Sequence, residues 1–381
     1  MQRNWLLDNF VIFVNCVYKT DISMGNRIIT LLICALMFFP SHLIAEGTAE
    51  PTSTHEGEKF NAGNFIVGHI ADSYEWHVLT FKGHHVSLPL PVIVYSKISG
   101  LHVFLSSNFH HGHESFNGFY IAPEGQYKGK VVELVNGSPE RPLDLSLTKV
   151  ATSMIFSVLL VLVIFISVAG SYKKRVGLAP KGLQSFMEPL ILFIRDDLAK
   201  PCIGEHRYKK FMPFLLTVFF FIFINNLLGL IPFLPGGVNV TGNISIALVL
   251  ALFTFAITTF TSTKGYWVHI FNTPGVPWWL KYPIPLMPVV ELMGVMTKPF
   301  VLMVRLSANI TAGHIIALGF VSLIFIFGQM APAAGFSASL LSVAFGIFMT
   351  LLELLVAFIQ AYVFAMLSAL YFGMAHVEDH H

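Results

Sequence analysis

Long apolar stretches separated by short polar connections fill the chain from about residue 148 onward. Ala151 to Ser171 is one such stretch, close to the roughly 20 residues that a helix needs to cross a bilayer. Phe211 to Ile231 and Ile244 to Phe260 are two more, and Asn243 stands where a capping side chain is expected. Leu183 to Leu198 mixes apolar and charged residues, which predicts an amphipathic helix at the membrane interface.

The last two apolar stretches, Ile284 to Gly328 and Phe336 to Tyr371, are too long for one perpendicular crossing. At 1.5 Å per residue such helices would measure about 54 to 68 Å, against a hydrocarbon core of about 30 Å. They must therefore tilt steeply, bend or break. Pro299 offers a kink, and the turn Ala331 to Gly335 would join the two stretches into a hairpin. We expect an all-α polytopic membrane protein with about five to six membrane helices, two of them long, tilted and paired.

Residues 46–147 have a different, more polar pattern. Trp76 to Phe81 and Leu101 to Leu105 carry the β-branched and alternating residues of short strands, so a small extramembrane region with β character is expected. Before it, residues 1–45 are interpreted as a leader and signal peptide with a possible true start at Met24. The alternative is that Ile28 to Ile44 is a retained anchor.

The polar and aromatic flanks predict an orientation. Lys173, Lys174 and Arg175 end the first membrane helix and should lie in the cytoplasm, which puts residues 46–147 outside it and the C-terminus inside. The tryptophan-rich loop Trp267 to Tyr282 belongs at a membrane surface. We therefore divide the chain into 1–45, an extracytoplasmic region 46–147, a membrane domain 148–376 and a polar tail 377–381.

Composition supports this class. The chain is 55% apolar and 12% charged with a mean hydropathy of +0.69, whereas soluble domains carry about 25% charged residues. The net charge of +2 forms no basic face, which argues against nucleic-acid binding. Nine of the 16 histidines fall within residues 46–147, and the run Phe109 to Glu114 could bind a metal or be an ordinary solvated loop.

Arg305 stands in the middle of an otherwise apolar stretch. A guanidinium keeps its proton, and placing it in hydrocarbon costs about 3 kcal/mol even on lenient scales. Small or amide-bearing residues surround it, which lets another helix approach: Ser307, Ala308, Asn309, Ala312 and Gly313. The segment predicts a helix that presents a fixed positive charge to a partner.

Other polar residues share this stretch and the next. Glu291, Lys298 and Arg305 recur every seven residues and form one helical stripe, while His314 follows Arg305 by nine residues and points the other way. Glu353 and Gln360 form a similar pair in the last stretch.

Two of these groups suit a proton path. A histidine titrates near neutral pH, and desolvation brings a glutamate there, so His314 and Glu353 are the natural candidates. The structural alternative is that Arg305 pairs internally with Glu353 or Glu291. Lys298 could equally reach an interface with its charged end. Asn309 and Gln360 could simply bond helices together.

These residues resemble subunit a of the bacterial F-type rotary ATP synthase. The matching motifs, within residues 147–376, are Lys298-Pro299, Arg305-Leu306-Ser307-Ala308-Asn309, Ala312-Gly313-His314, Asn226 to Pro232, Thr241 to Ser245 and Ile359 to Tyr362. Residues 46–147 depart from the family, whose typical members have a much shorter N-terminus, so their role does not transfer.

The resemblance implies roles for individual positions. Arg305 matches the essential arginine that faces the carboxylate of the rotating c-ring, and Asn309 and Gln360 match its polar partners. Glu291 matches an acid associated with a proton half-channel. His314 and Glu353 match the acid/histidine pair, in the swapped order of mitochondrial members. Lys298, Asn226 and Asn243 are further possible site positions.

The implied protein is a non-catalytic component of the synthase in the bacterial inner membrane, with two proton half-channels. Its partners would be the c-ring, subunit b of the peripheral stalk, lipid and protons, with no cofactor, metal or nucleic acid. A secondary transporter or channel is the alternative, although no inverted repeat is evident. A receptor or metal chaperone would leave Arg305 unexplained. Proton rather than sodium coupling is favoured by the His314/Glu353 pair.

Overall fold

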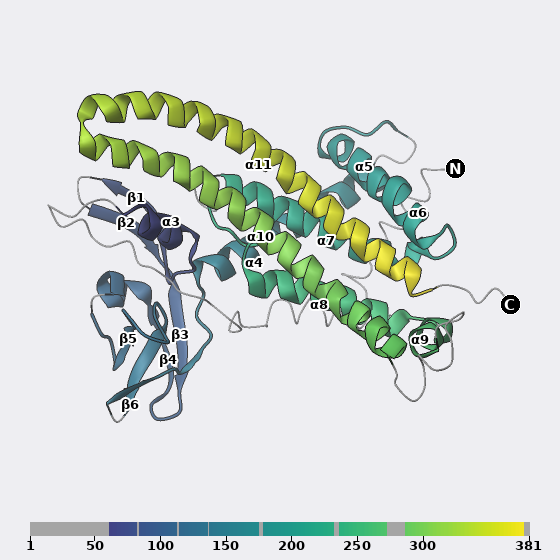
Figure 1. The fold of residues 1–381 in the computed structure, drawn as a ribbon, viewed down its shortest axis with the longest axis horizontal. Coiled ribbons are helices and arrows are strands. Elements are labelled where there is room, and N and C mark those ends of the chain that lie inside the picture. Colours follow the sequence, from purple (N-terminus) through teal and green to yellow (C-terminus); the bar gives the residue numbers. More distant parts are fainter. Residues whose placement is uncertain are drawn as a thin grey trace.

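The chain forms a bundle of membrane helices with a small β domain at one end (Figure 1). The computed structural model describes residues 61–81, 84–112, 114–135, 137–174, 178–231, 236–272 and 286–376. The predicted leader, the signal peptide and the C-terminal tail lie outside these residues, as do Trp278 and Trp279. The expected fold class, a polytopic helical membrane protein with an N-terminal β region, is confirmed.

Five described helices are long and apolar enough to cross a membrane. They are α4 (Lys149–Lys174), α7 (Tyr208–Leu230), α8 (Ile244–Thr261), α10 (Leu286–Met330) and α11 (Pro332–Met374). Each coincides with a predicted apolar stretch. Asn243 caps α8 as expected, since its side chain accepts a hydrogen bond from the Ser245 N–H at 3.0 Å.

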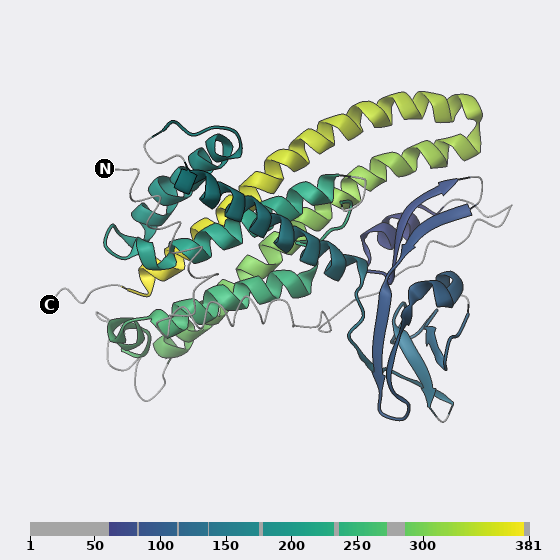
Figure 2. The same ribbon diagram turned by 180° about the vertical axis from the view of Figure 1, so that it is seen from behind.

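The two long helices form the expected hairpin, which crosses the whole molecule (Figures 1 and 2). Helix α10 continues through Pro299 without a break. The turn is tighter than Ala331 to Gly335, because only Ala331 is non-helical and proline suits the first turn of the next helix. A Cβ on Gly335 would lie 2.7 Å from the Gly328 Cα, so a glycine is required for the two helices to meet this closely.

Shorter helices lie beside the bundle. The predicted interfacial helix is α5 (Leu183–Phe193), which runs through a π-helical turn, Ile194–Ala199, into α6 (Lys200–Ile203). The prediction of a loop from Trp267 to Tyr282 is wrong in its first part, because Lys264–Phe271 forms helix α9. The Thr263 N–H just before α9 donates to the Ala375 carbonyl at 3.0 Å, which holds α9 against the end of α11.

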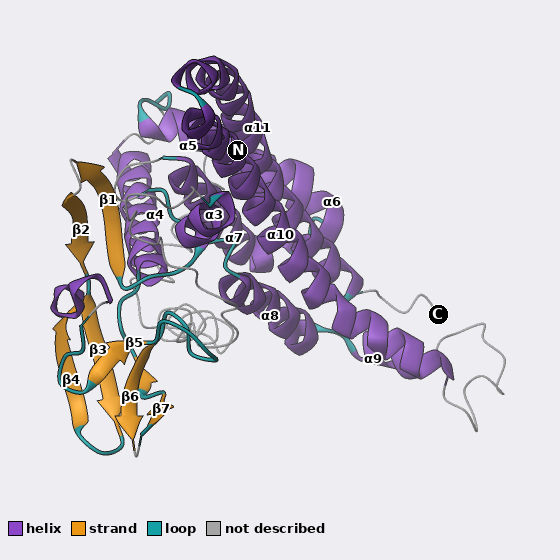
Figure 3. Ribbon diagram, turned by 60° about the vertical axis from the view of Figure 1, so that its left-hand side comes forward, coloured by secondary structure: helices purple, strands orange, loops and turns teal. Residues whose placement is uncertain are grey.

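The β domain consists of short antiparallel strands after helix α3 (Ala62–Ile70), as Figure 3 shows. The strands are β1 (Glu75–Phe81), β2 (His84–Pro89), β3 (Pro91–Ser96), β4 (Gly100–Leu105), β5 (Phe119–Ile121), β6 (Val131–Val135), β7 (Ser138–Glu140) and β8 (Leu143–Asp144). They pair as β1-β2, β4-β3-β8 and β5-β6-β7. Val92, Val94, Phe109, Phe119 and Val131 are fully buried between the last two sheets and form the core of the domain.

Hydrogen bonds fix the β domain to the start of α4. The Lys149 N–H donates to the Ser73 carbonyl at 2.9 Å, and the Val150 N–H donates to Asp72 Oδ1 at 3.2 Å. Burial raises the pKa of the Asp72 carboxyl, opposed chiefly by a hydrogen bond from Thr148. Helix α3 also packs on α10, where the Phe65 and Phe325 rings lie 6.0 Å apart. The domain is therefore held directly against the bundle.

Candidate functional site

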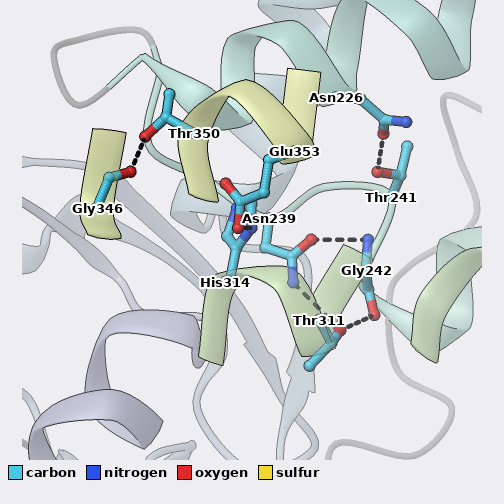
Figure 4. Close-up of polar contacts among 9 residues, drawn as sticks. All are labelled: Asn226, Asn239, Thr241, Gly242, Thr311, His314, Gly346, Thr350 and Glu353. Atoms are coloured by element: carbon cyan, nitrogen blue, oxygen red, sulfur yellow. Dashed lines mark hydrogen bonds and ion pairs between the residues drawn. The ribbon is translucent and has the colours of Figure 1, made fainter. Parts of the chain in front are cut away.

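A histidine and a glutamate face each other where α10 and α11 pack together (Figure 4). His314 Nδ1 lies 4.0 Å from Glu353 Oε1, and the two side chains are only 17% and 13% exposed. Among the described residues, His314 Nε2 and Glu353 Oε1 are buried without a hydrogen-bond partner. Buried polar atoms of this kind are rare in folded proteins and point to a functional constraint.

Two glycines provide the space for this pair. A Cβ on Gly313 would lie 2.9 Å from Glu353 Oε1, and a Cβ on Gly229 would lie 3.4 Å from His314 Nε2. Any larger residue at 313 would have to displace the carboxylate, because real Cβ atoms do not approach other atoms so closely. The glycine of α10 and the glycine of α7 therefore set the position of the two titratable groups.

A polar loop between α7 and α8 supports α10 one turn before His314 (Figure 4). The Asn239 amide nitrogen donates to Thr311 Oγ1 at 3.2 Å, and its oxygen accepts from the Gly242 N–H at 2.9 Å. Thr311 Oγ1 also donates to the Gly242 carbonyl at 3.3 Å. This closed set of bonds holds the face of α10 that carries His314.

Asn226 has a comparable linking position. Its amide nitrogen donates to the Ala357 carbonyl on α11 at 3.2 Å, and its oxygen accepts from the Thr241 hydroxyl. The buried amide thus joins α7, α11 and the loop before α8. The structure thus shows contacts for two of the further predicted site positions. Asn226 links helices by hydrogen bonds, and Asn243 caps α8.

Arg305 lies on a different face of α10. Arg305 and Asn309 are both exposed, whereas Leu302 and Leu306 beside them are almost fully buried. In the described part of the chain, no ion pair joins Arg305 to Glu353 or to Glu291. The structure therefore gives no support to an internal salt bridge. It offers the guanidinium to the outside of the hairpin.

Gln360 does not join Arg305 and Asn309 on that exposed face. Its side chain is only 7% exposed and lies on α11 among buried neighbours such as Ala357 and Ala361. The predicted residues thus form two groups, an exposed one of Arg305 with Asn309 and a largely buried one of His314 with Glu353, and Gln360 belongs to neither.

Lys298 has aromatic neighbours on two other helices. Its Nζ lies 5.7 Å from the centre of the Tyr266 ring and 5.3 Å from that of Tyr371. Burial, and after it the charge of Glu291, raises the pKa of the Tyr266 phenol. Both rings line a small pocket with Lys298 and the hydroxyls of Thr254 and Thr258. Cation–π contacts of this kind retain a charge away from bulk water, so the half-buried lysine is held in place by rings.

The two polar centres lie on opposite sides of Arg305 along α10. Lys298 precedes it by seven residues and His314 follows it by nine, which corresponds to about 10 Å and 14 Å along a helix. The exposed guanidinium of Arg305 therefore lies between two separate polar centres along α10, one around Lys298 and one around His314.

Sequence reasoning missed several of these residues. Gly229, Asn239, Thr311, Tyr266 and Tyr371 act through contacts between distant segments, which periodicity cannot reveal. The one local signal was the Gly-Gly-Val-Asn-Val-Thr-Gly-Asn run before α8, whose amides and glycines suggest a structured turn.

The histidine-rich segment of the β domain gives little support to the metal site that its sequence suggested. His110 Nε2 lies 3.6 Å from Glu114 Oε2, and both side chains are about two thirds exposed. Within the part of the chain that the structure describes, no group of three or more His, Cys, Asp or Glu side chains could hold a metal ion. His113 lies outside the described residues.

Comparisons with known proteins give a consistent result. A family described as "ATP synthase A chain" matches residues 151–373, and a domain of unknown function (DUF8433) matches residues 65–145. "ATP synthase subunit a 2" of Chlorobaculum tepidum is 46% identical over 248 residues, 62% of this chain and 66% of that protein. "ATP synthase subunit a" of Chloroherpeton thalassium is 43% identical, over 62% of this chain and 69% of its own length.

A further relative comes from another bacterial group. "ATP synthase subunit a" of Myxococcus xanthus is 42% identical over 65% of this chain and 79% of its own length. The chain spans just under two thirds of the length of the Chlorobaculum tepidum protein and somewhat more of the length of the other two proteins.

Proposed function

Because the chain belongs to the ATP synthase A chain family, we propose that it is the stator subunit of the membrane sector of a bacterial ATP synthase. It is then a non-catalytic component of the complex, a multi-pass protein of the inner membrane, and its membrane domain comprises residues 148–376. Family membership removes the reason to prefer a secondary transporter or a metal chaperone.

The outward position of Arg305 is the observation that supports this proposal most directly. A permanent cation on the exposed face of α10 stabilises the ionised form of a carboxylate that passes on a neighbouring helix. That carboxylate then releases its proton while it faces Arg305. Asn309, exposed one turn later, is available to hydrogen-bond the same group. The partner in this role is the c-ring.

The two inner polar centres take the roles of half-channels. His314 and Glu353 deliver protons from the extracytoplasmic side, and the carboxylate, once reprotonated, enters lipid as a neutral group. Glu291 and Lys298, on the other side of Arg305, conduct protons to the cytoplasm. Because the fixed charge of Arg305 lies between the two paths, protons cannot cross without rotation of the ring. Gln360, buried on α11, is a structural support of this interface.

The orientation follows from the flanking charges. Lys173 and Lys174 end α4, and such residues accumulate on the cytoplasmic side. Residues 46–147 are then extracytoplasmic and the C-terminus is cytoplasmic. Subunit b of the peripheral stalk would hold the protein against the torque of the ring, with membrane lipid around the remaining helices.

The test is proton pumping driven by ATP in inverted membrane vesicles. Arg305→Ala should abolish pumping while the complex still assembles, with Arg141→Ala in the β domain as the control that retains it. Normal coupled pumping by Arg305→Ala would overturn the proposed role of the arginine. Copurification with a c-ring tests the assignment to the synthase separately, because a transporter would purify without one.

A further inference from the structure

The closed half of the α10–α11 hairpin projects from the bundle of membrane helices. We call this half the outer arm and define it as residues 315–330 of α10 and 332–352 of α11, between the His314/Glu353 pair and the turn. In Figure 1 its closed end reaches beyond α7 and α8 along the long axis of the molecule. Among its described side chains, only Ser322 and Ser342 are buried. The outer arm therefore has little packing against the other membrane helices.

The two helices of the outer arm form one unit, because they pack closely against each other. The Phe320 and Phe345 rings stack with their centres 5.3 Å apart. Nearer the turn, Gly328 and Gly335 allow the two backbones to touch. Toward the bundle, hydrogen bonds from the loop before α8 and from α7 fix the inner ends of the two helices. A contact at one point beyond His314 therefore sets the angle of the whole arm.

Helix α3 of the β domain makes such a contact. The Phe65 ring on α3 lies 6.0 Å from the Phe325 ring on α10 and 4.4 Å from the His69 ring on its own helix. Phe325 follows His314 by eleven residues, which corresponds to about 16 Å along the helix. A support this far along the arm restricts its rotation more than a support beside the pair would, because it acts on a longer lever.

Helix α3 is itself fixed to the first membrane helix by reciprocal capping. Asp72, two residues after α3, accepts a hydrogen bond from the Val150 N–H in the first turn of α4 at 3.2 Å. In return, the Lys149 Nζ of α4 donates to the His69 carbonyl in the last turn of α3 at 3.2 Å. A carboxylate at a helix N-terminus and an ammonium group at a helix C-terminus are both favourably placed in the field of the helix dipole. The two caps hold α3 in position against α4.

We propose that α3 is a brace that sets the angle of the outer arm, with Phe65 as its positioning residue. The contacts run from α4 through the reciprocal caps to α3, and from Phe65 to Phe325 on α10. They tie the projecting arm to a helix that crosses the membrane separately. The β domain thus has a mechanical role, which is to stiffen the one part of the hairpin that the described membrane helices leave largely exposed.

The consequence of this brace for transport rests on the proposed stator function. Ile316 follows Arg305 by eleven residues, about three helical turns, and both side chains are exposed. The side of α10 that faces the rotor therefore continues onto the outer arm. The angle of the arm decides how closely this side follows the rotor, so loss of the brace should let protons leak past the interface. Fewer protons would then be pumped for each ATP hydrolysed.

Distances between spin labels in the assembled complex test the brace. Met330→Cys at the end of the arm and Ile231→Cys at the end of α7, both exposed, are labelled after the native cysteines are replaced by serine. Double electron–electron resonance then gives the distribution of distances between the two labels. Phe65→Ala should broaden or shift this distribution and lower pumping per ATP several-fold, whereas Phe65→Leu, which keeps a large apolar side chain, should recover both. Phe260→Ala, at an 81% exposed position on α8, is the matched control and should change neither.

A second pair of variants makes the result independent of the folding of α3. Phe325→Ala removes the same contact from the α10 side and should broaden the distribution as much as Phe65→Ala does. The double alanine variant should be no broader than either single variant, because both lose one shared contact. Asp72→Asn keeps an oxygen acceptor for the Val150 N–H and should resemble the unmodified protein more closely than Asp72→Ala.

Three results would overturn the proposal. An unchanged distance distribution in both single alanine variants would show that α3 does not brace the arm, and additive broadening in the double variant would show that the two rings act separately. A broadened distribution with normal pumping per ATP would remove the brace from coupling. Failure of the proposed stator function is seen separately, as normal pumping by Arg305→Ala, and leaves the measured distances unaffected.

Discussion

His314 Nδ1 lies 4.0 Å from Glu353 Oε1 across the contact between α10 and α11, while Arg305 on the same α10 is exposed on another face. The titratable pair and the permanent charge are therefore separate units, so each can be changed without removing the other. The following predictions use this separation.

ATP-driven proton pumping should suffer less when His314 and Glu353 are exchanged for one another than when either is removed. His314→Ala and Glu353→Ala should each slow ATP-driven proton pumping by about a hundredfold, the lower end of what positioned general acid–base groups contribute. The double exchange His314→Glu with Glu353→His should recover more activity than either single exchange, because it restores one acid and one imidazole. Thr350→Ala, which loses only a bond to the Gly346 carbonyl, is the control. Normal pumping by both alanine variants would remove the pair from the proton path.

Gly313→Ala should affect transport more than stability. The new methyl group would lie 2.9 Å from Glu353 Oε1, the end of a flexible side chain, so the carboxylate can move aside at a cost below about 1 kcal/mol. We expect pumping to fall several-fold at nearly unchanged thermal stability. Gly319→Ala, on the same helix with open space around its Cβ, should pump normally. Equal effects of the two substitutions would contradict a specific role for Gly313.

Loss of the Asn239 amide should loosen the support of His314. Asn239→Ala leaves the Gly242 N–H and the Thr311 hydroxyl without this partner, which we expect to cost about 1 to 3 kcal/mol. Thr311→Val should resemble it, whereas Thr311→Ser keeps the hydroxyl and should recover both thermal stability in detergent and pumping rate. A Thr311→Ser variant as impaired as Thr311→Val would show that packing, not the hydrogen bonds, matters there.

Lys298→Met tests whether the polar centre around Lys298, as distinct from the one around His314, takes part in transport. Methionine keeps much of the apolar stem and the contact with the Tyr266 and Tyr371 rings but removes the charge. If the lysine is part of the proton path, the variant should assemble normally and pump a few-fold more slowly. Lys264→Met, at an exposed position on α9, should be unaffected. Identical rates for both variants would make Lys298 a structural anchor only.

Asp196 should make stability depend on pH in acid. A hydrogen bond from Arg195 is the main cause that lowers the pKa of Asp196 to about 2, below its ordinary value of 3.8. Because the folded-state value is depressed, the stabilisation is complete above about pH 4 and is lost as the pH falls toward 2. The side chain is 40% exposed, so solvent screening limits the contribution to about 1 kcal/mol.

The measurement for Asp196 is the thermal midpoint in detergent between pH 5 and pH 2.5. Asp196→Asn should lower the midpoint at pH 5 and approach the unmodified protein at pH 2.5. Asp197→Asn, at the exposed neighbouring position, should follow the unmodified protein throughout. A constant difference between Asp196→Asn and the unmodified protein at all pH values would show that the ion pair with Arg195 and Lys200 contributes nothing that titrates.

The amino-acid sequence by itself determined the membrane class, the five spans and the overlong hairpin. Each of these follows from local properties: the length of an apolar stretch, the 1.5 Å rise of a helix and the cost of exposing backbone to lipid. The position of His314 on the opposite side of its helix from Arg305 was also predictable, because nine residues along a helix correspond to two and a half turns.

Only the tertiary structure decided which partners the polar residues find. The contacts of His314 with Glu353 and of Asn239 with Thr311 join residues 39 and 72 positions apart. Likewise, no local pattern shows that Gly313 must be small, since the constraint comes from a carboxylate on another helix. Packing between helices sets these distances and also turns Arg305 outward, because the face of α10 that carries Leu302 and Leu306 is the one that the rest of the bundle buries.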